Sequence, residues 1–497
     1  MPRVDLTADP LARSDAAMLA VAAFAGDGDD APPVPADGAG ALGEALGIDL
    51  AAELQAVGFS GSPGEVVRIP TRGAVTASTV VVVGLGAADD ATADHLRRAA
   101  AAVAGAAERV ETLATDLPAA LDTAEASDAA AAVVEGLLLG SYRFGTYRSE
   151  APVHRLEAVT LHVGDADAAG DAVAAAQVTA DATLFARDLV NTPPQDKRPP
   201  ALAERVAESF ADSDVQVRIL DEQALADGGY GGILGVGRGS SEPPRLVELT
   251  YAPDGASRHV ALVGKGITFD TGGISLKPSE AMETMKMDMA GAATVAAVVR
   301  AAADLRLPVK VTGLLALAEN MPSGTATRVS DVLTMKGGKT VEVINTDAEG
   351  RLVLGDALVH ASEQGPDAIV DIATLTGAAV VALGERIGVL MASDDALAGD
   401  LLAASRRTGE AFWQLPLATE QYGERLEGAI ADLRNAGSRS AGTIFAGLFL
   451  HEFVGDGIPW AHLDIAGVAW TDEPYGYHAK GATGVPVRTL VRWLQAG

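Results

Sequence analysis

Apolar runs alternate with stretches of helical pattern through most of the chain. In the first part, the apolar run at 79–86 is followed by the Ala-rich helical stretch at 95–114. Further along, helical patterns at 288–304, 352–364 and 441–454 separate apolar runs at 259–263, 309–317, 367–374 and 459–466. Strands that alternate with helices are typical of α/β layers. The pattern therefore predicts an α/β protein whose mixed, mostly parallel sheet is covered by helices.

A long helix in the first half of the chain marks the best candidate for a domain boundary. The helical pattern over 171–189 stops at Asn191-Thr192-Pro193-Pro194, because proline lacks the N–H group that a helix interior needs. The 497 residues also exceed what one domain usually holds. We predict a smaller N-terminal α/β domain over 1–170, a connecting helix over 171–190 and a larger C-terminal α/β domain over 191–497.

Composition narrows the classes of function. Lys plus Arg number 37 against 67 Asp plus Glu, so the formal net charge is −30. Such a field repels phosphates, which makes nucleic acids and anionic membranes unlikely partners. The chain has no Cys, which excludes disulfides, thiolate zinc sites and a cysteine nucleophile. A cysteine-free chain suits a reducing compartment, and we expect a cytoplasmic protein.

Membrane insertion and export are both disfavoured by the sequence. The apolar runs are shorter than the roughly 20 residues that span a bilayer. The run at 16–25 has the length of a signal-peptide core and ends in an A-x-A triplet, but Asp5, Asp9 and Asp15 make the preceding segment acidic. Because an export signal begins with positive charge, we interpret this run as a buried strand.

Two motifs that resemble binding sites have simpler interpretations. The glycine string at 228–239 indicates a tight backbone loop rather than a phosphate cradle. His451-Glu452 begins like a zincin helix, but Gly455 stands where the second histidine would be. His462, within an apolar run, is predicted to be a structural residue.

Three segments combine ionisable residues with apolar and glycine-rich surroundings. They are GKGITFDTGGISLKP at 264–278, MKMDMAGAA at 285–293 and NTDAEGRL at 345–352. Each begins or follows a predicted element, and open α/β sheets bind ligands beside strand ends. Their acids need counter-charge, because a buried unpaired carboxylate is costly. Lysine, arginine or a divalent metal could supply that charge.

Each of these residues also has a local structural interpretation. Thr346-x-x-Glu349 fits a capping box for the helix that follows. Asp288 fits a helix N-cap or first-turn acid, Asp270 fits a turn, and Lys277 fits a surface lysine. Taken one at a time, these residues do not require a functional site.

Taken together, the segments resemble the signature regions of the leucine aminopeptidase (cytosol aminopeptidase) family. Further matching segments lie in order along the chain from about residue 180 to the end: RDLVNTPP at 187–194, ENMPSGTATR at 319–328, DIATLTGA at 371–378, WAHLDIAG at 460–467 and KGATGVPVRTL at 480–490. The first 170 residues match only in general pattern. The resemblance implies that the C-terminal domain is a dinuclear-metal peptidase domain, in an enzyme that releases Leu and other apolar residues from the N-termini of peptides.

The resemblance also implies roles for individual residues. Asp270 and Glu349 would each contact both of two divalent ions, Lys265 and Asp288 would complete one site, and Asp347 would complete the other, partly through its main-chain oxygen. Mn or Zn is expected ahead of Mg or Co, which oxygen-rich ligand sets also accept. Four carboxylates carry a charge that two dications balance. An unprotonated Lys265 at pH 7 would cost roughly 5 kcal/mol, which a neighbouring cation offsets.

Two basic residues would be catalytic by the same resemblance. Lys277 would stabilise the oxyanion that develops when a metal-activated water attacks the scissile carbonyl. Arg351 stays protonated and cannot be a general base, so it would hold a bicarbonate that carries the proton. The pocket for the N-terminal side chain would be lined by Met285, Thr374, Gly377 and Ala466. Family members assemble as hexamers, so we expect a homohexamer.

Two alternative functions remain open from the sequence. Another two-metal hydrolase, such as a phosphoesterase or amidase, could use the same acids, and it would cleave phosphate esters but not leucine anilides. Some bacterial relatives also act as DNA-binding regulators, a role that the net charge opposes.

Overall fold

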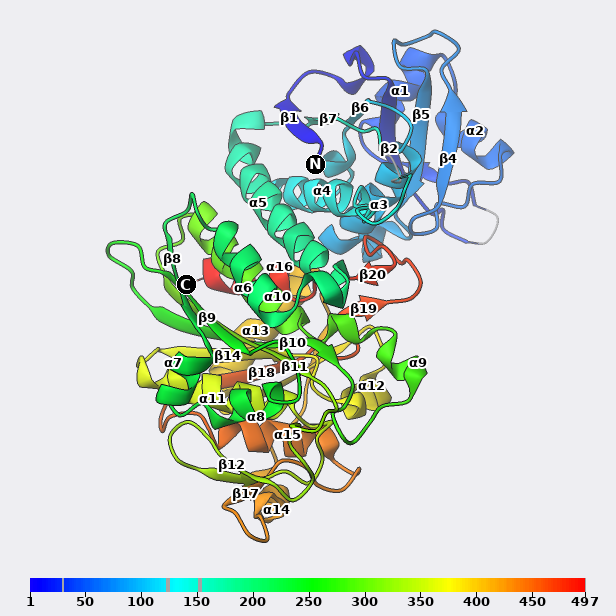
Figure 1. The fold of residues 1–497 in the computed structure, drawn as a ribbon. Coiled ribbons are helices and arrows are strands. Elements are labelled where there is room, and N and C mark those ends of the chain that lie inside the picture. The colour runs from blue at the N-terminus through cyan, green and yellow to red at the C-terminus, as the bar shows by residue number, and fades with distance from the viewer. Residues whose placement is uncertain (29–30, 122–125, 151–153, 497) are drawn as a thin grey trace. The chain divides into compact units, whose positions relative to one another are not determined.

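The structure is a computed structural model that describes residues 1–28, 31–121, 126–150 and 154–496 (Figure 1). The chain forms two compact units: one contains residues 1–184 and 473–479, and the other contains 185–472 and the chain after 479. The boundary between them lies inside the long helix α5 (Ala166–Asn191). Among the described residues, no helix is both long enough and apolar enough to cross a membrane.

The smaller unit contains a mixed sheet in the order β1-β7-β6-β2-β5-β4, with β3 paired to β2. Its elements are β1 (Arg3–Thr7), η1 (Leu11–Arg13), β2 (Met18–Phe24), β3 (Val34–Pro35), α1 (Ala39–Leu46), α2 (Leu50–Ala56), β4 (Val66–Pro70), β5 (Thr79–Gly84), η2 (Ala88–Asp90), α3 (Ala93–Ala106), β6 (Thr112–Thr115), η3 (Leu117–Ala120), α4 (Ala126–Gly140) and β7 (Ala158–His162). The apolar run at 16–25 contains β2, an almost entirely buried strand, as its pattern predicted. Alternate residues of β2 join two different apolar clusters, so both faces of the sheet are covered.

One helical prediction in this unit extended too far. The stretch at 95–114 was predicted to be helical, but α3 ends at Ala106 and Thr112–Thr115 form β6. The strand pairs with β2 on one side and with β7 on the other. Pairing between distant segments overrides the Ala-rich helical pattern here.

The larger unit is built on an eight-stranded sheet in the order β16-β15-β18-β14-β10-β11-β9-β8. The strands are β8 (Val215–Leu220), β9 (Arg245–Tyr251), β10 (His259–Asp270), β11 (Lys310–Asn320), β14 (Ala368–Ala373), β15 (Gly388–Ala392), β16 (Phe412–Gln414) and β18 (Trp460–Asp464), with β12 (Val332–Thr334), β13 (Thr340–Glu342), β17 (Leu433–Arg434), β19 (Trp470–Thr471) and β20 (Gly481–Ala482) in small sheets. The central strands β11, β10, β14 and β18 run parallel, whereas β8, β9 and the β15–β18 pair are antiparallel. The predicted mixed, mostly parallel α/β sheet is confirmed.

Helices lie on both faces of this sheet (Figure 1). The helices of the larger unit are η4 (Pro194–Asp196), α6 (Pro199–Glu208), α7 (Glu222–Asp227), α8 (Gly231–Gly237), α9 (Ser279–Met282), η5 (Met285–Met287), α10 (Ala290–Asp304), α11 (Gly350–Glu363), α12 (Gly377–Leu383), α13 (Asp395–Thr408), α14 (Thr419–Tyr422), η6 (Gly423–Leu426), α15 (Gly442–His451) and α16 (Val487–Gln495). Helices α8, α11 and α15 share one apolar core with the inner strands. Helix α10 packs on β10, β11 and β14 and also contacts α16.

The glycine string at 228–239 was predicted to be a loop, but most of it forms the short helix α8. The glycines serve close packing. A Cβ on Gly231 would overlap with the Thr334 carbonyl oxygen, and one on Gly232 would overlap with the Leu352 carbonyl oxygen. Tertiary contact therefore stabilises a helix that intrinsic propensity disfavours.

Candidate metal centre

Four central strands of the larger unit end in polar residues at the same edge of the sheet. Strand β10 ends at Asp270, β11 at Asn320 and β18 at Asp464, and Thr374 directly follows β14. The carboxyl ends of parallel strands meet at one edge, which is where ligand crevices form in open α/β sheets. The candidate site residues therefore collect where the topology favours a ligand site.

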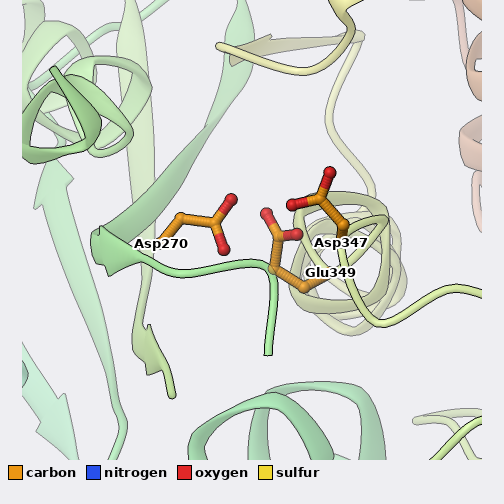
Figure 2. A group of neighbouring side chains, drawn as sticks. All are labelled: Asp270, Asp347 and Glu349. Carbon is orange, nitrogen blue, oxygen red and sulfur yellow. The ribbon is translucent and has the colours of Figure 1, made fainter. Parts of the chain in front are cut away.

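Three of the predicted acids converge at this edge. Ligand atoms of Asp270, Asp347 and Glu349 all lie within 4.8 Å of one another, and Figure 2 shows their carboxylates turned toward a common space. Asp270 and Glu349 are each 2 % exposed. Asp270 Oδ1 accepts hydrogen bonds from Gly272 N and Asn320 Nδ2, both at 2.8 Å, which fixes its orientation. The turn interpretation of Asp270 is thus correct locally but incomplete.

The loop before α11 is tied to the loop after β10, and no capping box forms. Glu349 is the N-cap of α11 and makes no side-chain capping bond. The Thr346 hydroxyl instead donates to Gly272 O at 2.7 Å and accepts from Ser275 N at 2.8 Å. These bonds hold the two acid-bearing loops together, which leaves the Glu349 side chain free to face the cluster.

Lys265 and Asp288 form a second part of the cluster. Lys265 Nζ lies 2.8 Å from Asp288 Oδ1 and 2.9 Å from Glu349 Oε1, and it also donates to Thr374 O at 3.0 Å. Asp288 is not a helix N-cap, because α10 begins at Ala290 after Met289. Its Oδ1 atom also accepts the Thr374 hydroxyl at 2.7 Å. The cap interpretation of Asp288 is therefore wrong.

Lys277 lies over the acids rather than in solvent. Its side chain is 17 % exposed, and its ammonium pairs with Asp270 Oδ2 at 2.9 Å and with Asp347 Oδ1. Burial would lower the pKa of Lys277, but the surrounding carboxylates raise it above its usual range. The group therefore stays an ammonium, and the surface-lysine interpretation is wrong.

The two lysines do not balance the negative charge of the four carboxylates Asp270, Asp288, Asp347 and Glu349. Burial, more than any other cause, raises the pKa of Asp288, Glu349 and Asp347, and the neighbouring Asp270 carboxylate raises all three further. Burial would lower the pKa of Lys265, but the carboxylates that surround it raise the pKa well above its ordinary value. The cluster therefore favours binding additional cations.

These residues fit a divalent cation. Asp288 Oδ2 and Glu349 Oε2 are buried and have no hydrogen-bond partner, which is costly for carboxylate oxygens unless a ligand satisfies them. Hard dications prefer such oxygens. All five predicted ligand residues are brought together through direct contacts with one another or with Lys277.

Arg351, on the first turn of α11, is buried beside this cluster. Its Nη1 donates to Asn435 O at 2.8 Å, its guanidinium lies 5.7 Å from the Phe445 ring centre, and its Nε is buried without a hydrogen-bond partner. Burial lowers the pKa of Arg351 to about 10. The guanidinium therefore remains charged at neutral pH and can still donate to a ligand.

The predicted pocket residues lie around the same strand ends. Asp464 Oδ1 accepts hydrogen bonds from Ala466 N and Leu375 N, both at 3.1 Å, and this pairs the segments that follow β14 and β18. Thr374 is buried against Lys265 and Asp288, whereas Gly377 begins α12 and is exposed. Met285 lies in η5, three residues before Asp288.

Two asparagines that were not among the predicted site residues organise the site. Asn320 Nδ2 donates to both Asp270 Oδ1 and Thr346 O. The fully buried Asn435 side chain accepts from Ile344 N and donates to Asn345 O and Ala348 O. Asn320 could have been found from its position at the end of an apolar run, like Asp270. Asn435 does not stand at the end of an apolar run, so its position in the sequence does not mark it.

His462 has the structural role expected for it. It is fully buried in β18, and its Nδ1 lies 2.5 Å from Asp371 Oδ1. Trp460 Nε1 donates to the other oxygen of the same carboxylate at 2.8 Å. This pair stabilises the sheet beneath the site.

Sequence families and related proteins agree with this geometry. Residues 184–491 match the cytosol aminopeptidase family, catalytic domain, and residues 20–151 match its N-terminal domain. A Streptomyces coelicolor protein named probable cytosol aminopeptidase is 49% identical over 98% of this chain and 96% of its own. A Micrococcus luteus protein of the same name is 49% identical over 100% of this chain and 99% of its own.

Two solved structures are also similar to this chain over nearly its whole length. The bottromycin maturation enzyme BotP in complex with Mn has a TM-score of 0.86 and 44% identity, covering 97% of this chain and 99% of its own. A mutant of tomato leucine aminopeptidase has a TM-score of 0.89 and 32% identity, covering 100% of this chain and 97% of its own. The chain belongs to the cytosol aminopeptidase family and is a metal-dependent hydrolase that releases N-terminal residues from peptides.

Proposed function

We propose that this aminopeptidase uses two divalent ions and prefers substrates with an N-terminal Leu or another apolar residue. The convergence of Asp270, Asp347 and Glu349 within 4.8 Å is the observation that carries this proposal. Lys265 and Asp288 adjoin the three acids through Glu349, so the donor set is larger than one ion needs.

The ligands would divide between the two ions. Asp270 and Glu349 would serve both, Lys265 and Asp288 would complete one site, and Asp347 would complete the other, partly through its main-chain oxygen. When bound, such ions would supply Lewis acidity, which would polarise the scissile carbonyl and make a water molecule more acidic. Manganese is the first ion to test, because the related BotP structure is a complex with Mn; zinc, magnesium and cobalt are the alternatives.

Lys277 stabilises negative charge on the substrate. Its ammonium is held over the cluster by Asp270 and Asp347, and it can turn an N–H toward the carbonyl oxygen of a bound peptide. A donor fixed in advance stabilises the oxyanion of the tetrahedral transition state more than the neutral carbonyl. Lys277 is therefore assigned to transition-state stabilisation.

Arg351 orients a proton carrier. The guanidinium cannot act as a base because it stays protonated, but its Nη1 is fixed by Asn435 O while Nε has no protein partner. The free donors suit a planar, bidentate anion. We assign bicarbonate to this position, since it can accept a proton near neutral pH.

Substrate preference is assigned to Met285, Thr374, Gly377 and Ala466. Gly377, but not the other three, also lines a surface groove at the start of α12, together with aliphatic residues such as Val381 and Ile444 and the polar residues Arg439 and Thr443. Its mostly aliphatic walls suit an apolar side chain. We also propose that the chain assembles as a homohexamer.

Hydrolysis of leucine anilide tests the proposed function. Protein stripped with a chelator should be inactive, and Mn or Zn should restore activity at two ions per chain, measured by metal analysis and absorbance of the released aniline. Leucine anilide with an acetylated amine should not be cleaved, since an aminopeptidase requires a free N-terminus. Cleavage of phosphate esters in place of the anilide would support the other hydrolase class.

Two variants at opposite ends of helix α11 distinguish loss of the metal centre from general disruption of the fold. Glu349→Ala should abolish activity and reduce the bound metal. Glu363→Ala, at the far and exposed end of α11, should leave both unchanged. Full activity of the Glu349→Ala variant would reject the proposed ligand set.

A further inference from the structure

Lys197 is a fully buried lysine that the mechanism above does not use. It directly follows the turn η4, its exposed fraction is 0 %, and no carboxylate among the described residues pairs with it. A buried lysine without an ion-pair partner is rare. Its environment therefore calls for a specific explanation.

Three main-chain carbonyl oxygens surround the Lys197 amine. Nζ donates to Leu189 O at 3.1 Å, to Val190 O at 2.7 Å and to Lys286 O at 2.7 Å. An ammonium has three N–H donors, so each finds one acceptor. A neutral amine has only two and would leave one carbonyl unsatisfied. The three carbonyl oxygens thus form a small cation site, and the cation that occupies it is the ammonium group of Lys197.

The carbonyls belong to two segments that are distant in sequence. Leu189 and Val190 lie in the last turn of α5, where the helix dipole favours a cation. Burial lowers the pKa of Lys197 well below its ordinary value, and Lys286 and Arg205 lower it further. The dipole and the three acceptors oppose that effect and favour the charged form.

A second lysine completes the same junction. Lys286 lies in η5, and its own Nζ donates to Asn191 O at 3.2 Å. The last three carbonyls of α5 are thus capped by two lysines, one of which also binds the main chain of the other. Lys286 stands one residue after Met285 and two residues before Asp288. The segment 285–288 is therefore fastened to the end of α5.

We propose that Lys197 is a positioning residue of the metal centre, acting as a built-in monovalent cation that fixes segment 285–288 in place. The inference rests on the proposed function in one respect, namely that Asp288 is a metal ligand and Met285 lines the substrate pocket. Through Lys286 O, the Lys197 ammonium sets the distance between Asp288 and the remaining acids. It does not contact substrate or metal.

Replacement by methionine removes the donors and keeps a long side chain. Lys197→Met should weaken Mn binding, measured by calorimetry on chelated protein, and lower kcat by about 10- to 100-fold, the usual effect of losing a group that orients a metal ligand. KM for leucine anilide should change less than kcat. Lys310→Met, at the start of β11, is the matched control and should change neither quantity.

Rescue by small amines distinguishes a cation site from simple core packing. Lys197→Ala removes three methylene groups and the amine, the same groups as in n-propylammonium. Addition of n-propylammonium or ammonium should restore Mn affinity and kcat in part and raise the unfolding temperature. Tetramethylammonium at equal ionic strength has no N–H group and should not restore them.

Two results would overturn the proposal. One is a Lys197→Met variant with unchanged Mn affinity and kcat below its unfolding temperature, even if it is less stable. If that variant does not fold, absence of rescue of Lys197→Ala by n-propylammonium rejects the cation site. A wild-type protein that binds Mn but does not cleave leucine anilide would reject the proposed function alone, because the metal titrations still measure the effect of Lys197.

Discussion

Lys277 is a single residue whose replacement should affect catalysis without affecting metal binding, since its ammonium is held by acids from two different segments. Lys277→Ala should lower kcat by about 10²- to 10³-fold, the usual loss when an oxyanion donor is removed. Bound metal, measured by elemental analysis, should be unchanged, because the carboxylates remain. Lys336→Ala removes another largely buried lysine that pairs with an acid outside the site, and it should retain activity. An active Lys277→Ala variant would remove this residue from the mechanism.

Asp116 in the smaller unit should make stability depend on pH. Its carboxyl is 8 % exposed and lies beside Gly38, and burial raises its pKa to about 7, although a backbone hydrogen bond opposes this. In the unfolded chain its pKa is about 4. The folded chain therefore binds this proton more tightly, and its stability falls as the pH rises from about 4 to about 7.

Asp116→Asn removes that titration while keeping the side-chain shape. The free energy of unfolding of the variant, relative to wild type, should increase between pH 5 and pH 8, by at most about 2.7 kcal/mol, because only the two pH units from pH 5 to the folded pKa contribute. Denaturant unfolding followed by fluorescence at both pH values measures it. A difference that is equal at pH 5 and pH 8 would contradict the assignment.

Taken one at a time, the residues in the motifs did not predict a site, and local patterns did not predict their contacts. Thr346 and Glu349 fit a capping box perfectly well, yet Thr346 binds the loop after β10 instead. Packing between distant segments decides whether Thr346 caps the helix or binds the other loop, and local sequence rules do not describe that packing. The family resemblance supplied what local rules could not, because it carried the spatial arrangement along with the motif.

At the scale of elements, the packing of α10 on β10 and β14 depends on two glycines. A Cβ on Gly291 would overlap with Ile372 O, and a Cβ on Gly264 would lie 2.6 Å from Ala292 Cα. The close approach brings the start of α10, and with it Asp288, next to Lys265. A larger residue at either position must move the helix away from the sheet.

Gly291→Ala should therefore lower both the unfolding temperature and the affinity for Mn. Overpacking of this kind costs about 1–3 kcal/mol, and scanning calorimetry with and without metal measures both effects. Gly399→Ala in α13 is the matched control, since a Cβ there meets nothing within 4 Å. The control should be slightly stabilised, because alanine favours helix. Equal behaviour of the two variants would contradict the packing argument.

Element boundaries were predicted best where the apolar pattern is unbroken. The run at 367–374 corresponds to β14 almost residue for residue. The run at 259–263 covers only the first part of β10, which continues to Asp270. Three residues interrupt the apolar pattern: Lys265 faces the site, Gly264 faces α10, and Gly266 lies against β11. The residues that form the site therefore weaken the apolar pattern that would otherwise have predicted the second half of β10.

At the scale of the whole molecule, the chain mass of 50.4 kDa gives a direct test of assembly. Sedimentation velocity should show one species at six times that mass if the proposed hexamer forms. Charge repulsion opposes association, so the species should persist or strengthen when salt is raised. A monomer across that range would reject the hexamer. The cytoplasmic location and the predicted domain limits of 1–170, 171–190 and 191–497 stay predictions.

The spacing of the acids along the chain has a mechanical consequence. Asp270 and Asp347 are separated by about 80 residues of chain, and an ion bound by both, as proposed, would close that part of the chain into a loop much as a covalent bridge would. The chain has no cysteine to provide such a bridge. Binding of metal would therefore restrain this part of the chain reversibly. An added protease should cut the chain between β11 and α11 more slowly when metal is bound.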